Sequence, residues 1–230
     1  MNILVIVAHP DDPEFFAGGA LARWSAEGNH ISYAIVTGGQ KGSDRTDITP
    51  HELAELREVE QRNAAAELGI HDIRFLHYVD GELFNTLELQ RDLAREIRRS
   101  KPHTIVTTDH QTVHTYSRGI NHNDHRAMGL AVCDAVFPAS NNRMYFPELL
   151  DEGFELHYPK EIYFAGPINP NTWVDVDDYL GIKARAVCKH ASQVKEPDPA
   201  KMEMRMRQGA FRMLADGSVR YWEAYRRVLL

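Results

Sequence analysis

Two short segments of the chain hold most of the side chains that could bind a metal ion. Residues 8–14 read Ala-His-Pro-Asp-Asp-Pro-Glu, which places one imidazole and three carboxylates close together. A second segment begins at Asp109 and ends with His-Asn-Asp-His at 122–125. Imidazole and carboxylate ligands suit Zn²⁺, Fe²⁺ and similar divalent ions, and three protein ligands with an open position are typical of a catalytic site. The two segments together therefore indicate a metal-dependent enzyme.

The spacing within the first segment divides its side chains between two roles. His9 and Asp12 stand three residues apart across a turn stiffened by prolines, so both can face one ion. A third ligand has to come from the second segment, where His122 and His125 are the candidates. Neighbouring side chains diverge, so one of Asp11 and Asp12 can bind the ion while the other reaches a water molecule bound to it. Without a metal, the same acids would only favour the start of a helix, where carboxylates are stabilised.

Strand-like and helix-like patterns alternate through the first half of the chain. The run Ile3–Val7 is apolar throughout and rich in β-branched residues, as expected of a strand buried on both faces. Repeated strand–helix units predict a Rossmann-like α/β fold, a mostly parallel sheet with helices on both faces. The expected strands are Ile3–Val7, Ile31–Val36, Ile73–Leu76 and Thr104–Thr108, and the expected helices are Phe15–Glu27, Thr49–Leu68, Leu87–Arg99 and Asp124–Phe137.

The pattern is weaker beyond Pro138. One further strand is expected at Glu161–Ala165, and helices are expected at Asp178–His190, Pro199–Leu214 and Tyr221–Arg227, which predicts a helical C-terminal part. Because no linker or repeat divides the chain, residues 1–230 are expected to form a single domain. In open α/β sheets, ligands bind beyond the carboxyl ends of the strands, where the strand order reverses. With the strand order 3-2-1-4, the two metal-binding segments would flank that crevice.

Composition narrows the range of functions. The 230 residues include 26 Lys and Arg against 33 Asp and Glu, a net charge of −7, which argues against nucleic acid and an anionic membrane as partners. No apolar run approaches the roughly 20 residues that span a bilayer. The first strand lacks the preceding basic residues of a signal peptide, and Cys133 and Cys188 are expected as free thiols. A cytoplasmic protein with a small-molecule substrate is expected, and the sequence leaves a homo-oligomer open.

The motifs resemble those of the LmbE-like or PIG-L family of N-acetylglucosaminyl deacetylases. The resemblance rests on residues 8–14 followed by Gly18-Gly19, and on His-Asn-Asp-His at 122–125. The stretch Glu-Leu-Arg-Glu-Val-Glu at 55–60 is similar to the Arg-containing second helix of the family, and His-Ala-Ser-Gln at 190–193 is similar to its late His-x-Ser-Gln element. The match runs in order through about the first 135 residues, with a weaker part near residue 190.

The resemblance implies roles for the residues nearest the metal. His9, Asp12 and His125 would bind one zinc ion per chain, although another divalent ion would suit the same ligands. Asp11 would be the general base that takes a proton from the attacking water. The reaction implied is removal of the acetyl group from an N-acetylated amino sugar or a related small amide.

Four further residues receive roles from the same resemblance. His122 would stabilise the oxyanion and protonate the leaving amine, and Asp124 would hold His122 in place. Arg57 would contact the substrate or the acetate product, and His190 is expected among the substrate-binding residues.

Other functions stay open on the sequence. A zinc-dependent amidase could act on a thiol–sugar conjugate or an acylated natural product with the same metal ligands. A metal-containing binding protein without turnover would have no need of the spare carboxylate of Asp11. A nucleotide-binding Rossmann protein would carry Gly-x-Gly-x-x-Gly after the first strand and an acid after the second, where this chain has Thr37-Gly38.

The chain also departs from the family pattern in ways that concern the substrate. Gln40 stands where the second loop of the family usually has Glu, and Asn123 stands where Pro is common. Ile120 occupies a position that is Tyr in some members. None of these positions supplies an expected metal ligand, so the metal chemistry is expected to be intact.

Overall fold

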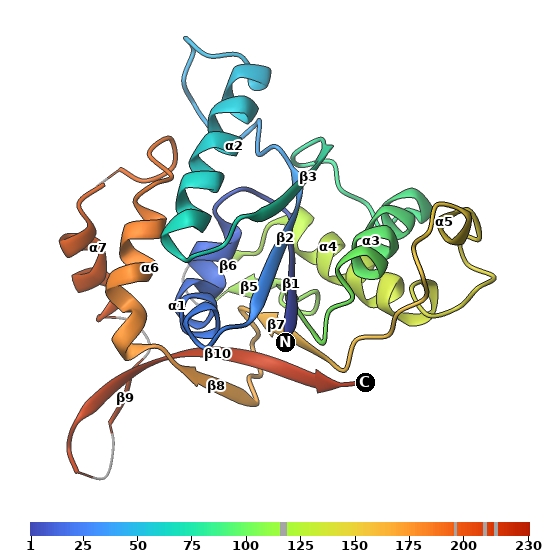
Figure 1. Ribbon diagram of the computed structural model, residues 1–230. Coiled ribbons are helices and arrows are strands. Elements are labelled where there is room, and N and C mark those ends of the chain that lie inside the picture. The colour runs from blue at the N-terminus through green and yellow to red at the C-terminus, as the bar shows by residue number, and fades with distance from the viewer. Residues whose placement is uncertain (116–118, 196, 209–210, 214–215) are drawn as a thin grey trace.

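A mostly parallel sheet forms the centre of the protein (Figure 1). The structure is a computed structural model, and it describes all residues except 116–118, 196, 209–210 and 214–215. The strand order is β3-β2-β1-β4-β7-β10-β8, with β9 paired to β10. The bounds are β1 Asn2–Val7, β2 His30–Thr37, β3 Asp72–Tyr78, β4 Thr104–Thr108, β7 Glu161–Ala165, β8 Thr172–Asp175, β9 Phe211–Met213 and β10 Val219–Leu229.

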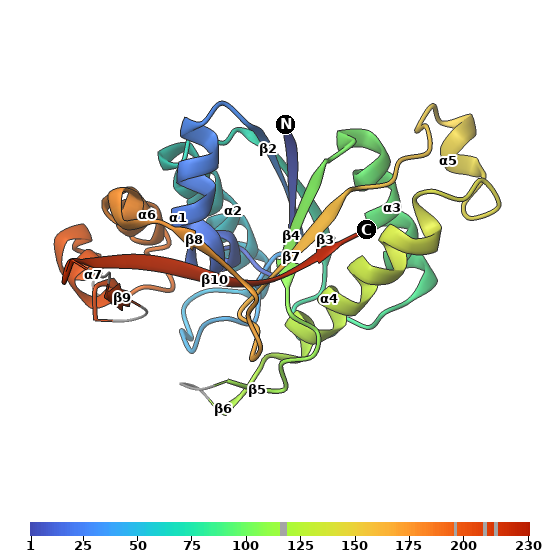
Figure 2. The ribbon, with the colours of Figure 1, turned by 90° about the horizontal axis from the view of Figure 1, so that it is seen from below.

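Helices cover both faces of this sheet (Figures 1 and 2). One face carries α1 (Asp12–Ala26), α2 (Pro50–Glu67) and α6 (Leu180–Val187), with α7 (Pro199–Met206) packed on α6. The other face carries α3 (Leu87–Ser100) and α4 (Asn123–Asp134), which is followed by a π-helical turn at Ala135–Ala139 and by α5 (Glu148–Asp151). A short hairpin of β5 (His114–Thr115) and β6 (Gly119–Ile120) precedes α4. Among the described residues, no helix is both long enough and apolar enough to cross a membrane.

Strand β1 shows why the sheet is buried on both sides. Its side chains alternate between two hydrophobic clusters, so Val5 and Val7 pack under α1 while Leu4 and Ile6 pack under α3 and α4. A strand in the middle of a parallel sheet has no face left for water, which explains its unbroken apolar run. Strand β1 pairs in parallel with β2 on one side and β4 on the other. The predicted Rossmann-like α/β fold and the 3-2-1-4 order are therefore confirmed.

The C-terminal prediction was wrong for the last element. Residues 221–227 lie in strand β10, which runs antiparallel between β7 and β8, and not in a helix. The predicted helix over Pro199–Leu214 ends at Met206, and Phe211–Met213 form β9; residues 209–210 and 214 lie outside the described residues. Glu223 and Tyr225 are both buried and stand two residues apart, and this two-residue period is typical of a strand. Aromatic side chains also favour strands.

Candidate metal centre and active site

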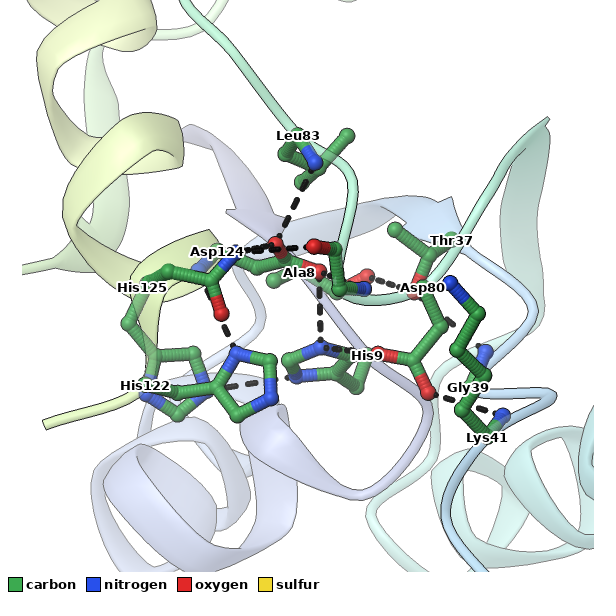
Figure 3. Close-up of polar contacts among 12 residues, drawn as sticks. Ala8, His9, Thr37, Gly39, Lys41, Asp80, Leu83, His122, Asp124 and His125 are labelled. Atoms are coloured by element: carbon green, nitrogen blue, oxygen red, sulfur yellow. Dashed lines mark hydrogen bonds and ion pairs between the residues drawn. The ribbon is translucent and has the colours of Figure 1, made fainter.

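Four of the predicted site residues, His9, His122, Asp124 and His125, lie close together beyond the ends of the central strands (Figure 3). The turn between β1 and α1 carries His9 and Asp11, and Asp12 is the first residue of α1. The start of α4 carries Asp124 and His125, and α4 packs against β1 and β4. Because β1 and β4 are neighbours, the two segments flank the crevice where the strand order reverses, as the topology rule requires.

His9, Asp12 and His125 meet with the spacing of ligands around one ion. His9 Nδ1 lies 3.3 Å from His125 Nε2 and 3.4 Å from Asp12 Oδ2, and His125 Nε2 lies 3.0 Å from Asp12 Oδ1. In a tetrahedral site with ligand distances of about 2.0–2.2 Å, donor atoms lie about 3.3 Å apart. The three donors therefore fit a four-coordinate divalent ion, and the fourth position is left for a ligand other than protein.

Both histidines have their second ring nitrogen next to an oxygen acceptor. His9 Nε2 lies 3.1 Å from Asp80 Oδ1 and 3.3 Å from Asp124 Oδ2. His125 Nδ1 lies 3.1 Å from the amide oxygen Oδ1 of Asn121. These acceptors place the N–H on the outer nitrogen of each ring, which leaves the inner nitrogen with its lone pair toward the other ligands. Metal-binding histidines are usually oriented in this way.

The charges around His9 favour a cation at this position. Burial opposes a charged imidazole, but the carboxylates of Asp12, Asp124 and Asp80 raise the pKa of His9 well above its ordinary value. Burial alone would raise the pKa of Asp12, whereas His125 and His9 hold it well below its usual range. Burial likewise opposes ionisation of Asp80, and its contact with His9 lowers the pKa to about 2. The cluster therefore stabilises positive charge where the three ligands meet.

Asp11 is held in an unusual backbone conformation beside these ligands. Its φ of 96° lies in the left-handed region, which is strained for a residue with a side chain. Its backbone N–H donates to Gln61 Oε1 at 2.8 Å, and its Oδ2 lies 3.2 Å from Arg57 Nη2. Burial raises the pKa of Asp11 to about 6, although Arg57 acts in the opposite direction. A carboxylate with this pKa is suited to accept a proton near neutral pH.

Arg57 lies at the floor of the same site. The residue is 3% exposed, and its guanidinium donates to the carbonyl oxygens of Gly39 and Pro10 and contacts Asp11. Arg57 also lines the cavity over His9, Asp12 and His125, and this position is compatible with the predicted contact with substrate. That contact stays a prediction.

Asp124 supports a different histidine from the one predicted. Its carboxylate is fully buried, accepts the backbone N–H groups of Gly81 and Leu83, and lies beside His9 Nε2. Its hydrogen bond with His122 runs instead from its own backbone N–H to His122 Nδ1, at 3.2 Å. The first turn of α4 directs the carboxylate inward, where it contacts and orients His9, one of the three candidate ligands.

His122 occupies the N-cap of α4, beside His9 and His125. Its ring meets the ring of His9 edge-on, with centroids 4.6 Å apart. Partial burial and the nearby His9 and His125 lower the pKa of His122. Since Nδ1 accepts a backbone hydrogen bond, the proton of the neutral ring resides on Nε2.

His190 lies behind the site and not in it. It is completely buried, with Nε2 3.0 Å from Glu14 Oε2. Glu14 is also fully buried and accepts hydrogen bonds from Gln61 Nε2 and Tyr33 Oη. A side chain without exposed surface has no access to a molecule in the cavity, so the predicted substrate contact of His190 does not fit its position. The late His-x-Ser-Gln element instead supports the polar network beneath Asp11.

A cavity of about 700 Å³ opens onto His9, Asp12 and His125. Asp80 and Asn121 line this cavity and orient His9 and His125. Neither of them was identified as a site residue from the sequence. Asp80 follows the carboxyl end of β3. Ligands in open α/β sheets bind beyond the carboxyl ends of strands, so the same rule that selected the segments after β1 and β4 could have identified it. The lining of this cavity is partly polar and partly apolar. The polar lining includes His9, Asp11, Asp12, Arg57, Asp80, Asp109, Thr112, His114, Asn121, His122 and His125, and the apolar lining includes Phe15, Phe16, Ile120, Ala165, Pro167 and Ile168.

Several known proteins resemble this chain over most of its length. Diacetylchitobiose deacetylase of Thermococcus kodakarensis is 30% identical over 195 residues, which cover 85% of this chain and 71% of that protein. A probable N-acetyl-α-D-glucosaminyl L-malate deacetylase of Bacillus anthracis is 28% identical over 197 residues, covering 84% and 81%. The structure of N,N′-diacetylchitobiose deacetylase from Pyrococcus horikoshii, 27% identical, matches with a TM-score of 0.85 over 99% of this chain and 84% of that chain.

The family match covers the metal-binding segments themselves. Residues 4–136 match PIG-L, the family described as GlcNAc-PI de-N-acetylase. This range includes His9, Asp12 and His125, together with Asp11. Because the match spans both segments and more than half of the chain, this protein belongs to the PIG-L family, as its motifs predicted.

Proposed function

We propose that this protein is a zinc-dependent deacetylase that hydrolyses the acetamido group of an N-acetylated amino sugar. The observation that carries the proposal is the grouping of His9, Asp12 and His125 within ligand spacing, with the unused carboxylate of Asp11 beside them. The names of the relatives support the reaction class, because they are deacetylases of sugars that contain N-acetylglucosamine.

One zinc ion per chain fits the donor set. Two imidazoles and one carboxylate with an open fourth position are typical of catalytic zinc. Bound there, Zn²⁺ would lower the pKa of a coordinated water toward about 7 and polarise the amide carbonyl.

The side chains around the metal would handle the protons of the reaction. Asp11 would accept the proton of the attacking water and deliver it to the amine nitrogen, because the C–N bond breaks readily only when that nitrogen is protonated. Arg57, 3.2 Å from Asp11 Oδ2, would hold the carboxylate in position. His122 lines the cavity with its proton on Nε2, where it would donate to the carbonyl oxygen as negative charge develops. The products would be acetate and the free amino sugar.

The proposal is tested by amine release from N-acetylglucosamine and N,N′-diacetylchitobiose. The protein is stripped with a chelator and reloaded with one equivalent of zinc; activity is expected only after reloading. Asp11→Asn is expected to lower kcat by about 10²-fold or more, in line with the contribution of a general base, and to leave zinc content unchanged. Asp216→Asn, at an exposed turn, serves as the control. Absence of amine release by the zinc-loaded wild type, or full activity of Asp11→Asn, would overturn the proposal.

A further inference from the structure

The cavity over His9, Asp12 and His125 contains a group of apolar side chains for which hydrolysis of an acetyl group has no use. We call this group the apolar wall; its members are Phe16, Ile120, Pro167 and Ile168. Ile120 is 73% exposed and Ile168 is 38% exposed, although both line the cavity. Apolar side chains that line a cavity and remain open to water are typical of a surface that binds an apolar group.

Contacts between separate segments fix the position of the apolar wall. Phe16, in α1, packs edge-on against the ring of His125, with centroids 5.3 Å apart. A Cβ atom on Gly166 would lie 3.1 Å from Phe16 Cε1, so the segment after β7, which carries two members of the wall, lies against the same ring. The hydroxyl of Thr112 donates to the carbonyl oxygen of Gly166 at 3.2 Å, and Asn121 Nδ2 donates to the carbonyl oxygen of Thr112 at 2.8 Å. These bonds hold the base of the β5–β6 hairpin to the segment after β7, beside His125.

The proposed general base lies among different neighbours. Asp11 contacts Arg57, whose guanidinium also donates to the carbonyl oxygens of Gly39 and Pro10. The amide nitrogen of the substrate has to reach Asp11, because Asp11 delivers the proton to it in the proposed reaction. The carbonyl carbon carries the nitrogen on one bond and the acyl chain on another, so the chain points away from Asp11. The apolar wall beside His125 is then the surface that this chain meets.

The chemistry of the apolar wall selects a hydrocarbon chain over a sugar. Its side chains offer no hydrogen-bond donor or acceptor, so a sugar hydroxyl placed against them would lose its bonds to water without replacement. A methylene group gains from the same transfer, by about fourfold in affinity for each one that is fully buried. The cavity of about 700 Å³ is also within the size range that encloses drug-sized ligands, which leaves space beyond a single N-acetylated sugar.

We propose that the apolar wall binds the hydrocarbon chain of N-acyl groups longer than acetyl, such as butanoyl and hexanoyl, and that the enzyme hydrolyses these amides as a further activity. The inference rests on the proposed deacetylase function and extends it to longer acyl groups. The reaction is the same hydrolysis: the oxygen of water bonds to the acyl carbon, the C–N bond breaks, and a proton of the water goes to the nitrogen. The products are the fatty acid and the free amino sugar.

The test compares four substrates of the zinc-loaded enzyme. Three differ in the acyl chain: N-acetyl-, N-butanoyl- and N-hexanoylglucosamine. The fourth, the hexyl glycoside of N-acetylglucosamine, carries the same length of chain on the sugar instead. We expect kcat/KM for the hexanoyl compound to exceed that for the acetyl compound by about tenfold or more, with the butanoyl compound between them, because methylene groups are buried. The hexyl glycoside is expected to show no such gain.

Two substitutions place a hydroxyl on the apolar wall. Ile120→Ser and Ile168→Ser are each expected to lower the ratio of kcat/KM for the hexanoyl compound to that for the acetyl compound by about threefold or more, because contacts with methylene groups are lost. Both residues are exposed, so the variants are expected to fold. Val219→Ser, at an exposed residue of β10 outside the cavity lining, is the matched control and is expected to leave the ratio unchanged.

The outcomes separate this inference from the proposed function. If the acetyl compound is the equal of the hexanoyl compound, if the hexyl glycoside shows the gain instead, or if both isoleucine variants keep the wild-type ratio, the inference is wrong although the enzyme is a deacetylase. If no substrate is turned over, the proposed function fails, and calorimetric titration of the hexanoyl and acetyl compounds into zinc-loaded Asp11→Asn still decides the inference. A Kd about tenfold lower for the hexanoyl compound supports it, and equal Kd values overturn it.

Discussion

Asn121 shows how a neighbouring side chain can orient a candidate metal ligand. Its amide oxygen lies 3.1 Å from His125 Nδ1, while its own Nδ2 and backbone N–H donate to the carbonyls of Thr112 and Val113. The two anchors fix the orientation of the amide, and the amide fixes the tautomer of His125. Loss of such an orienting partner commonly weakens metal binding by about 10- to 100-fold.

The prediction is that Asn121→Leu lowers zinc affinity within that range, because the Nδ1–H of His125 loses its acceptor. Asn121→Asp keeps an oxygen at the same position and is expected to bind zinc within about threefold of the wild type. Competition against a chromogenic chelator measures both constants. Wild-type affinity in Asn121→Leu would show that the tautomer is set by something else.

Gln61 fixes the strained turn at Asp11 from below. Its Oε1 accepts the backbone N–H of Asp11, and its Nε2 donates to both carboxylate oxygens of Glu14, at 3.0 Å each. Glu14 is completely buried, so a lost donor leaves part of its charge without a partner. Such a loss costs about 1–3 kcal/mol of stability.

We predict that Gln61→Met lowers stability by about this amount and also lowers kcat by about 10- to 100-fold, because the general base is displaced. Thr104→Val is the matched control, since it removes a 2.7 Å hydrogen bond to buried Glu161 at the opposite end of β4. The control is expected to lose stability with kcat unchanged. Chemical denaturation and steady-state kinetics at a temperature where all variants are folded measure the two effects; an unchanged kcat in Gln61→Met would contradict the positioning role.

Residue spacing identified two of the three candidate metal ligands and left the third open. The three-residue step from His9 to Asp12 was sufficient to pair them, whereas the choice between His122 and His125 depends on the direction of α4. His122 forms the N-cap, and His125 is the residue that reaches Asp12. The partners of Asp124 and His190 were not predictable either, because both depend on contacts between segments more than 40 residues apart.

At the scale of elements, Gly18-Gly19 connects α1 with the C-terminal half of the chain. The Glu223 carboxylate of β10 accepts the backbone N–H groups of Gly19 and Ala20 at 2.9 Å each, and Lys183 of α6 binds Glu223 at 2.6 Å. A Cβ atom on Gly19 would lie 2.6 Å from Val176 Cβ and 3.0 Å from Glu223 Oε1. The glycine therefore permits close approach of α1, the helix that begins with Asp12.

Gly19→Ala is expected to destabilise the protein by about 1–3 kcal/mol, the usual cost of overpacking a buried contact. Gly181→Ala, in α6, is the control: its nearest atom is the end of the flexible Glu203 side chain at 3.2 Å. That variant is expected to be neutral or slightly stabilising, since alanine favours helix more than glycine does. Denaturant unfolding midpoints report the difference, and equal midpoints would refute the packing argument.

The elements of the N-terminal half were predictable because local pattern and tertiary environment agree there. A strand covered on both faces has to be apolar throughout, and the helix at Pro50 opens with a capping box between Thr49 and Glu52. Strand β10 is different, because its polar and aromatic residues are placed by pairing with β7 and β8 and by the buried partners of Glu223. No local signal shows those partners.

At the scale of the whole molecule, the topology determines where chemistry takes place. Strands β1, β3 and β4 are parallel to one another, so the segments after them gather on one edge and bring together the candidate metal ligands and Asp80. Strand β10, from the end of the chain, lies between β7 and β8 in the same sheet. That residues 1–230 form a single domain stays a prediction.

The zinc affinity of the purified protein, determined by equilibrium dialysis and elemental analysis, tests the proposed metal site most directly. The wild type is expected to bind one zinc per chain, and His9→Ala, Asp12→Ala and His125→Ala are each expected to weaken binding by 100-fold or more. His114→Ala, which removes another histidine from the same cavity, is expected to leave it unchanged. Stoichiometric zinc bound with wild-type affinity after loss of any of the three ligands would contradict the account.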